Sequence, residues 1–481
     1  MKPTIYFRAD GNSQIGLGHV VRSLALAGMI KEGFECKFII RDPSPEIKKQ
    51  ILEVCSEIIE LKSGIAGEAE LIAAKYISKN DITVLDGYHF DTQYQKVFKE
   101  RGTKLVCIDD LHQIHFVADA VINHAYGIER EDYKAEFYTR FYLGPEYALL
   151  RLPFLVATKE HRTVSKTENL FISLGGSDPQ NCTLSIIKGI INFDRIKRID
   201  VVLGSGYLYF ETLKEFKGNT KINFHKNLNA KEICALMKDS DIGICSASTV
   251  SYEYCSVGGL LFIVKTASNQ EKLYDFLLNE KLGLDFKGFE KNYTSEAGYF
   301  IDVQKKYFNG ESAKNIQKIF RSLALEDEIL IRKALKEDIK LYFEWANDPL
   351  TRNNSINKQP IKWEDHGKWF YEKLTDKNTY LFLFSIQNNL FGQLRFDKMK
   401  DYWLINFSVD KNYRGRGLAE SLVHKGIVEL KQIINCPFIL KAQVLDQNTA
   451  SANIFKKLNF KIEDPQIINS EKFNNFIKHV D

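Results

Sequence analysis

A histidine follows a glycine-containing turn near the start of the chain, in the stretch Gly16-Leu17-Gly18-His19. The turn comes after an apolar run at residues 4–9 and the acidic Asp10, and it opens a helical pattern of apolar residues. Glycines at a strand-to-helix turn let a ligand approach the backbone, and the free N–H groups of a first helical turn attract anions. The histidine can act as a general base beside that anion. The stretch therefore indicates a phosphate-bearing substrate, while a tight turn with a capping histidine explains the same residues equally well.

Two further turns lie farther along the chain, at 175–178 and 246–249. Each follows an apolar strand pattern and opens a helix, which is where open α/β sheets bind ligands. The hydroxyls of Ser248 and Thr249 suit a diphosphate, and Glu253, one turn later, could accept hydrogen bonds from ribose hydroxyls. Taken alone, an N-cap followed by a solvated glutamate explains this pattern as well. The amides of Asn269 and Gln270 follow the next strand and could bind sugar hydroxyls, although a polar turn would look the same.

The elements that must position these turns form two series of alternating strands and helices. The first series occupies residues 1 to about 145, and the second begins at Asn169. Such alternation predicts parallel sheets covered by helices, so we expect two Rossmann-like domains at 1–150 and 151–326. A ligand would lie between them.

A different pattern begins at about residue 327. Three consecutive strands are expected at 380–385, 391–396 and 402–409, and a basic loop, Arg414-Gly415-Arg416-Gly417, then opens an amphipathic helix. Strands in succession before a loop-helix unit predict an α+β domain at 327–481. Successive N–H groups in such a loop can hold phosphates, and a basic turn without a ligand is the alternative.

The composition excludes several classes of protein. The net charge of the 481 residues is +4 and the basic residues are dispersed, which argues against a nucleic-acid binder. The eight cysteines form no C-x-x-C pair, and neither a signal peptide nor an apolar run of about 20 residues is visible, so we expect a cytoplasmic protein without a membrane segment. His112 and His115 beside two aspartates could bind a metal, but no complete ligand set accompanies them, and we expect no metal.

The stretch 8–22, with the turn at 175–178 and the helix at 248–253, resembles one family of nucleotide-sugar enzymes. It is the UDP-2,4-diacetamido-2,4,6-trideoxy-β-L-altropyranose hydrolase family of pseudaminic acid synthesis, which is similar in architecture to GT-B glycosyltransferases. The resemblance covers roughly residues 1–325. It implies that His19 activates water at the anomeric carbon, that Asp10 and Tyr88 line the same pocket, and that no metal is needed. Residues that bind the UDP-sugar would be Gly18, Gly176, Ser177, Ser248, Thr249, Glu253, Asn269 and Gln270.

The pattern Arg414-x-x-Gly417-x-Ala419 resembles the acetyl-CoA loop of the GNAT N-acetyltransferases. The opening at 345–349, with His366 and Trp369, is similar to the branch that contains the pseudaminic-pathway acetyltransferase. The resemblance implies acetyl-CoA as co-substrate, bound by Arg414, Gly415, Arg416, Gly417, Ala419 and Asn448. Many members have a tyrosine where Phe455 stands, and it protonates the departing CoA thiolate. Phenylalanine cannot donate a proton, so neither the general acid nor the general base is assigned from the sequence.

Together the two resemblances predict a bifunctional enzyme that acetylates a UDP-linked amino sugar and then hydrolyses the UDP-sugar. Two alternatives stay open: a GT-B glycosyltransferase that passes the sugar to an acceptor, and a nucleotide-sugar-binding module without turnover joined to an acetyltransferase of other amines. The oligomeric state does not follow from the sequence.

Overall fold

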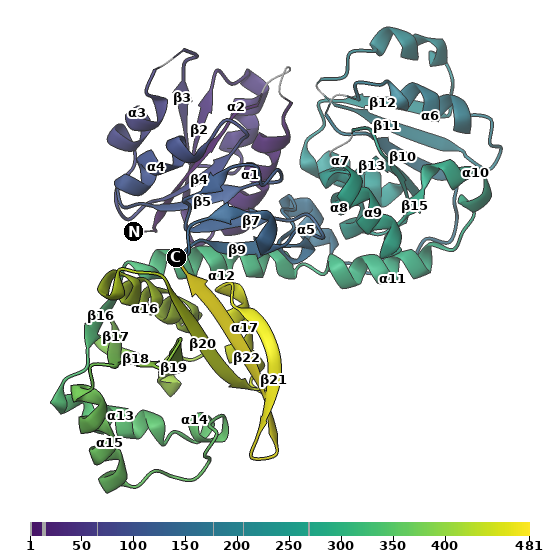
Figure 1. Cartoon of the computed structure of the whole chain (residues 1–481). Coiled ribbons are helices and arrows are strands. Elements are labelled where there is room, and N and C mark those ends of the chain that lie inside the picture. Colours follow the sequence, from purple (N-terminus) through teal and green to yellow (C-terminus); the bar gives the residue numbers. More distant parts are fainter. Residues whose placement is uncertain (1, 12–15, 65, 177, 205, 268–269) are drawn as a thin grey trace. The chain divides into compact units, whose positions relative to one another are not determined.

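The computed structural model describes residues 2–481 except 12–15, 65, 177, 205 and 268–269 (Figure 1). The chain folds into two compact units. The first consists of Met1–His115, Val121–Lys134 and Tyr142–Gln317, and the second of Phe116–Ala120, Ala135–Phe141 and Lys318–Asp481. Among the described residues, no helix is long and apolar enough to cross a membrane.

The first sheet is built around β1 and has the order β3-β2-β1-β4-β5-β7-β9. The pairs β1/β2, β1/β4, β2/β3 and β4/β5 are parallel. Because β2 and β4 flank β1 on opposite sides, the chain changes direction between β1 and β4, and the carboxyl ends of these strands form a topological switch point. The strands are β1 (Thr4–Ala9), β2 (Glu35–Arg41), β3 (Glu57–Leu61), β4 (Ile82–Asp86), β5 (Lys104–Ile108), β7 (Ala120–Asn123) and β9 (Arg140–Leu143), and the short β6 (His115–Phe116) and β8 (Lys134–Ala135) form a separate two-stranded sheet.

Helices follow the strands of this sheet in the order that the alternating pattern predicts. Ile5, Phe7 and Ala9 of β1 are fully buried, as expected for a central strand covered on both faces. The helices are α1 (Gly18–Ile30), α2 (Pro45–Leu52), α3 (Glu68–Lys75), α4 (Thr92–Glu100) and α5 (Leu152–Ala157).

The second sheet of the first unit has the order β12-β11-β10-β13-β14-β15, and every neighbouring pair is parallel. Its switch point lies between β10 and β13. The strands are β10 (Asn169–Ser173), β11 (Arg198–Leu203), β12 (Ile222–Lys226), β13 (Ile242–Ser246), β14 (Leu260–Val264) and β15 (Leu284–Asp285). The helices are α6 (Cys182–Ile190), α7 (Ala230–Asp239), α8 (Thr249–Val257), α9 (Glu271–Asn279), α10 (Phe289–Asn292) and α11 (Ala297–Tyr307), and α12 (Glu311–Glu326) begins in the first unit and ends in the second. The prediction of two Rossmann-like parallel sheets is thus confirmed.

The third sheet belongs to the second unit and has the order β16-β17-β18-β19-β20-β22-β21. Its pairs are antiparallel except β19/β20, which is parallel and joined only at Trp403↔Leu440 and Leu404↔Lys441. Helix α16 packs on β16, β18 and β19. The strands are β16 (Ile329–Lys333), β17 (Thr379–Ile386), β18 (Asn389–Lys398), β19 (Trp403–Val409), β20 (Phe438–Leu445), β21 (Lys461–Ile468) and β22 (Glu471–Val480), and the helices are α13 (Ile339–Ala346), α14 (Pro349–Asn353), α15 (Trp363–Thr375), α16 (Leu418–Ile434) and α17 (Thr449–Lys457).

Candidate active sites

His19 lies in the first turn of α1, against the end of β4. Its Nδ1 is 2.7 Å from Oδ1 of Asp86, which is fully buried. Arg22 Nη2 is also 3.3 Å from Nδ1, but the contact with the carboxylate is the shorter one. Because an ionised carboxylate only accepts hydrogen bonds, this contact assigns the proton to Nδ1 and leaves Nε2 able to accept a proton. A histidine oriented in this way by a buried carboxylate has the geometry of a general base.

Arg22 holds the Asp86 carboxylate in its ionised form. Its Nη2 is 2.6 Å from Oδ1 and its Nε is 3.0 Å from Oδ2 of Asp86, while Nη1 reaches Asp110 at 3.0 Å. Burial alone would raise the pKa of Asp86, but Arg22 and His19 outweigh it and lower that pKa below its usual value. Asp86 is therefore a carboxylate that can stabilise a positive charge on His19.

The lowered pKa of Asp86 gives the fold a pH dependence. The stabilisation by the ion pair is fully present above the pKa of an unfolded aspartate, about 4, and is lost as the pH falls through the lower folded value. We expect Asp86→Asn to lower the free energy of unfolding by about 3 kcal/mol at neutral pH, because it leaves Arg22 less compensated. Urea titrations of both proteins should show this difference shrinking as the pH falls below 4. A difference that is the same at every pH would mean that the ion pair does not stabilise the fold.

Tyr88 covers His19 from the side of the solvent. The two rings meet edge to face with centroids 4.6 Å apart, and the Tyr88 hydroxyl donates to Asp110 Oδ2 at 3.3 Å. Burial and the neighbouring Asp110 raise the pKa of Tyr88 to about 12, so the hydroxyl stays protonated at neutral pH. Since the side chain is 55% exposed, it can also contact a substrate above His19.

Asp10 lies in a different cluster from the His19 pair. Its carboxylate binds Arg8 Nη1 and Nη2 at 2.5 and 2.8 Å, accepts from the Arg41 backbone N–H at 2.9 Å, and lies 3.3 Å from His89 Nε2. Burial opposes ionisation, but these donors hold the pKa of Asp10 well below its usual range. The structure thus brings His19 and Tyr88 together, and gives Asp10 the surroundings of a structural carboxylate.

His124 follows β7 at the same edge of the sheet. Its Nδ1 accepts from the Leu149 backbone N–H at 3.2 Å, and burial lowers the pKa of His124 to about 4. The ring is therefore neutral at neutral pH and carries its proton on Nε2. Asp86, Arg22 and His124 have no assigned role in the sequence analysis. Asp86 and His124 lie at strand ends and Arg22 lies one helical turn after His19, and these positions could have been used to predict a role for them.

The turns of the second sheet converge at its switch point. Ser246 Oγ and Ser248 Oγ are 2.9 Å apart, and Thr249 begins α8. Gly204 lies so close to the loop before α6 that a Cβ on it would be 2.2 Å from the carbonyl oxygen of Gly176. Only glycine fits there. The structure thus gathers Gly176, Ser248 and Thr249 at neighbouring strand ends, while Ser177 lies outside the described residues.

Two of the side chains predicted to bind the UDP-sugar are hydrogen-bonded to other parts of the protein in this structure. Glu253 is buried, and its two oxygens accept from Arg151 Nε and Nη2 at 2.6 and 2.8 Å. Gln270 Oε1 accepts from the Thr266 backbone N–H at 2.8 Å. Asn269 lies outside the described residues. Sequence patterns locate such side chains, but they do not show a partner such as Arg151, which lies 102 residues from Glu253 in the chain.

The Arg151–Glu253 pair gives a stability prediction. We expect Glu253→Ala to lower the free energy of unfolding by about 3–5 kcal/mol, because it leaves Arg151 without its carboxylate. Urea unfolding followed by circular dichroism measures the loss. The double variant Arg151→Met/Glu253→Met, which removes both charges, should recover most of it. A Glu253→Ala protein as stable as wild type would show that the ion pair does not stabilise the fold.

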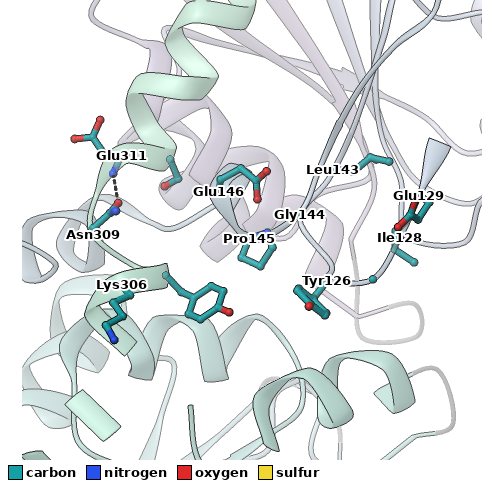
Figure 2. A pocket seen from close by; sticks show the side chains of 13 residues that line it. Tyr126, Ile128, Glu129, Leu143, Gly144, Pro145, Glu146, Lys306, Asn309 and Glu311 are labelled. Carbon is teal, nitrogen blue, oxygen red and sulfur yellow. Dashed lines mark hydrogen bonds between the residues drawn. The ribbon is translucent and has the colours of Figure 1, made fainter. Parts of the chain in front are cut away.

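A cavity of about 440 Å³ lies in the first unit beside the start of α12 (Figure 2). Tyr126, Pro145, Glu146 and Lys306 line it, and the Glu311 backbone N–H donates to Asn309 Oδ1 at 2.9 Å at its rim. None of the predicted site residues lines this cavity.

The second unit contains a larger cavity, of about 980 Å³. It lies beside the point where β19 and β20 stop pairing after Leu404, and residues 405–409 line it together with residues 414, 415 and 417–419. Gly415 and Gly417 have φ of +75° and +80°, and a Cβ on either would have no atom within 4 Å. The space beside these two glycines is therefore open at the N-terminus of α16, which is where a phosphate could approach the backbone.

The residues predicted to bind acetyl-CoA lie on both sides of this cavity. Arg414 is bonded to Asp348 Oδ1 at 2.7 Å and to the Val409 carbonyl oxygen at 3.0 Å, so it fixes the loop. Arg416 stacks on the ring of Tyr413, with 5.0 Å between its guanidinium carbon and the ring centroid. Ala419 lies in the first turn of α16 and lines the cavity. At the other side of the cavity, Asn448 Oδ1 accepts from the Ser451 backbone N–H at 3.2 Å and caps α17.

Comparison with known proteins now assigns this region. A model of the acetyltransferase (GNAT) family matches residues 339–460. The carboxy-terminal region is a GNAT acetyltransferase domain. The chain is also similar to the UDP-2,4-diacetamido-2,4,6-trideoxy-β-L-altropyranose hydrolase of Campylobacter jejuni, with 27% identity over 59% of this chain and 99% of the relative. It is also 24% identical to the spore coat polysaccharide biosynthesis protein SpsG of Bacillus subtilis, over 58% of this chain and 81% of SpsG.

An uncharacterized protein of Methanocaldococcus jannaschii is similar along nearly the whole length. It is 27% identical over 486 residues, which are 94% of this chain and 95% of the relative. The alignment with this relative thus includes residues of both compact units.

The GNAT domain has no tyrosine at the place of Phe455. This ring is buried, lines the cavity and packs on Phe407, Phe460 and Phe476. His366 is a titratable side chain that lines the cavity. Its Nε2 donates to the Ile339 carbonyl oxygen at 3.1 Å, and burial lowers the pKa of His366. His366 is therefore neutral at neutral pH.

Proposed function

We propose that the chain is a bifunctional enzyme of nucleotide-sugar metabolism. Its first unit hydrolyses UDP-2,4-diacetamido-2,4,6-trideoxy-β-L-altropyranose to UDP and the free sugar, and its GNAT domain transfers an acetyl group from acetyl-CoA to the 4-amino group of the UDP-sugar precursor. The observation that carries the hydrolase proposal is the buried Asp86 bonded to Nδ1 of His19 at the switch point of the first sheet. Homology to the Campylobacter hydrolase supports it.

In the hydrolase site, His19 Nε2 accepts a proton from water as the water oxygen attacks the anomeric carbon. The bond between that carbon and the diphosphate oxygen breaks, and UDP leaves with the bonding electrons. Asp86 stabilises the imidazolium that forms, as a buried carboxylate does in other His–Asp pairs. In the proposed GT-B arrangement the turns with Gly176 and Ser248 hold the diphosphate, where N–H groups stabilise the charge that develops on it.

In the GNAT domain, the 4-amino nitrogen attacks the thioester carbonyl, and the CoA thiolate leaves as the amide forms. The loop at 414–419 would hold the pyrophosphate of acetyl-CoA, and the backbone N–H groups that β19 leaves unpaired after Leu404 would bind its chain. The amine nitrogen loses a proton to solvent as the amide forms, and because Phe455 supplies none, water or another residue must protonate the thiolate. Joining two consecutive enzymes in one chain raises the local concentration of their shared intermediate.

The first test is the reaction of the purified protein with the UDP-sugar in ¹⁸O-water, in the presence of EDTA and without any acceptor. We expect release of UDP that carries no ¹⁸O, because water attacks carbon and not phosphorus. Release that requires an acceptor would favour a glycosyltransferase. UDP-sugar binding without any release would favour a binding module and would overturn the hydrolase proposal.

A further inference from the structure

The compact unit of the GNAT domain includes a segment from much earlier in the chain, residues 135–141. Phe137 packs against the core of the third sheet. The backbone of this segment is bonded to two side chains of the domain. His424 Nε2, in α16, donates to the Tyr138 carbonyl oxygen at 2.9 Å, and Asn459 Nδ2, in the turn after α17, donates to that of Thr139 at 2.8 Å. The segment is thus an integral part of the domain, although the family match begins only at residue 339.

Arg140 is the charged residue of this segment that enters the domain most deeply. Its Nη1 and Nη2 are 2.6 and 3.3 Å from the two carboxylate oxygens of Glu326, and both side chains are only 1% exposed. Lys425 Nζ donates to the Glu326 carbonyl oxygen at 2.6 Å and so holds the end of α12. The position of the guanidinium is therefore fixed from several sides.

The same guanidinium reaches the first turn of α16. Arg140 Nη1 is 3.8 Å from Oε1 of Glu420, and Lys457 Nζ is 3.6 Å from Oε2 of the same carboxylate. Glu420 directly follows Ala419 of the 414–419 loop, and both Glu420 and Lys457 line the large cavity. An acidic side chain in the first turn of a helix is attracted to the N–H groups there, and it repels any anion bound at them.

We propose that Arg140 is a positioning residue for acetyl-CoA: it holds the Glu420 carboxylate and offsets its charge, so that the N-terminus of α16 stays open to the pyrophosphate. The inference rests on the proposed binding of acetyl-CoA at the 414–419 loop. If Arg140 has this role, residues 135–141 are a functional part of the acetyltransferase, although they lie outside residues 327–481. Lys457 supports Glu420 from the opposite side.

The test uses the full-length protein with Arg140→Met/Glu326→Gln, which removes the arginine without stranding the buried Glu326. Calorimetric titration with acetyl-CoA should give a Kd about fivefold to tenfold higher than wild type at low salt, and a smaller increase at high salt, because salt screens the repulsion from Glu420. Adding Glu420→Gln should restore the Kd to nearly the wild-type value. Asn459→Ala, which breaks another bond to the segment without changing any charge, is the matched control and should bind acetyl-CoA like wild type.

Three outcomes separate the inference from its premise. Wild-type protein that binds no acetyl-CoA would overturn the proposed acetyltransferase function. An unchanged Kd in Arg140→Met/Glu326→Gln would overturn the role of Arg140 alone. Weaker binding that Glu420→Gln does not restore would also overturn it, because the arginine would then support only the fold and not the charge balance at the phosphate site.

Discussion

Replacing His19 by alanine should lower the rate of UDP release by about 10²- to 10⁴-fold, the range typical for loss of a general base. The physical reason is the loss of Nε2, the ring nitrogen that the bond from Nδ1 to Asp86 leaves free to take a proton from water. The binding of UDP should change little, because the turns expected to hold the diphosphate are on the second sheet. The measurement is UDP release by coupled assay, together with the Kd of UDP by calorimetry.

Two variants control this experiment. His161→Ala removes the same ring from an exposed position and should leave the rate unchanged. Asp86→Asn keeps the size of the side chain but can accept only through one oxygen, so it should allow the wrong tautomer of His19 and also lower the rate strongly. If His19→Ala released UDP as fast as wild type, another residue would be the base.

The parallel sheets could be predicted because the signals for them are local. Apolar runs such as 4–9 and 242–246 are long enough to be buried strands, and turn residues follow each of them. The carboxyl ends of these strands also predict where a ligand would bind, since that edge is shared by every parallel strand of a sheet. His19 and Tyr88, 69 positions apart, were assigned to one pocket, and the structure places their rings in contact.

Partners distant in sequence could not be predicted, because they depend on how elements pack. Asp10 and Asp86 both follow or end strands of the first sheet, yet Arg8 and Arg41 hold Asp10, while His19 and Arg22 share Asp86. The sequence pattern gave no reason to prefer Asp86. The expected boundary at residue 327 had the same limitation. In the sequence, residues 135–141 continue the Rossmann-like series, and only contacts formed in the folded chain, such as that of Arg140 with Glu326, place them within the second unit.

Replacing Gly417 by valine should weaken the binding of acetyl-CoA and leave the rate of UDP release unchanged. Gly417 has φ of +80°, where an L-residue costs about 1–2 kcal/mol. If the free loop relieves this strain by leaving the conformation that binds acetyl-CoA, binding must restore it, which corresponds to a rise of about fivefold to thirtyfold in KM for acetyl-CoA. The methyl groups would also occupy open space at the cavity beside the N-terminus of α16. Acetyl-CoA saturation curves, followed by release of the CoA thiol, measure the effect.

Gly218→Val is the matched control for this loop. Gly218 has φ of +90° and equally open surroundings, but it belongs to the first unit, so the same substitution imposes the same kind of strain away from the cavity. Both variants should lose similar stability in urea, and only Gly417→Val should raise the KM for acetyl-CoA. If the two variants gave the same KM, the loop at 414–419 would not hold the pyrophosphate. A higher KM in Gly417→Val alone would assign the effect to the phosphate site rather than to general loss of stability.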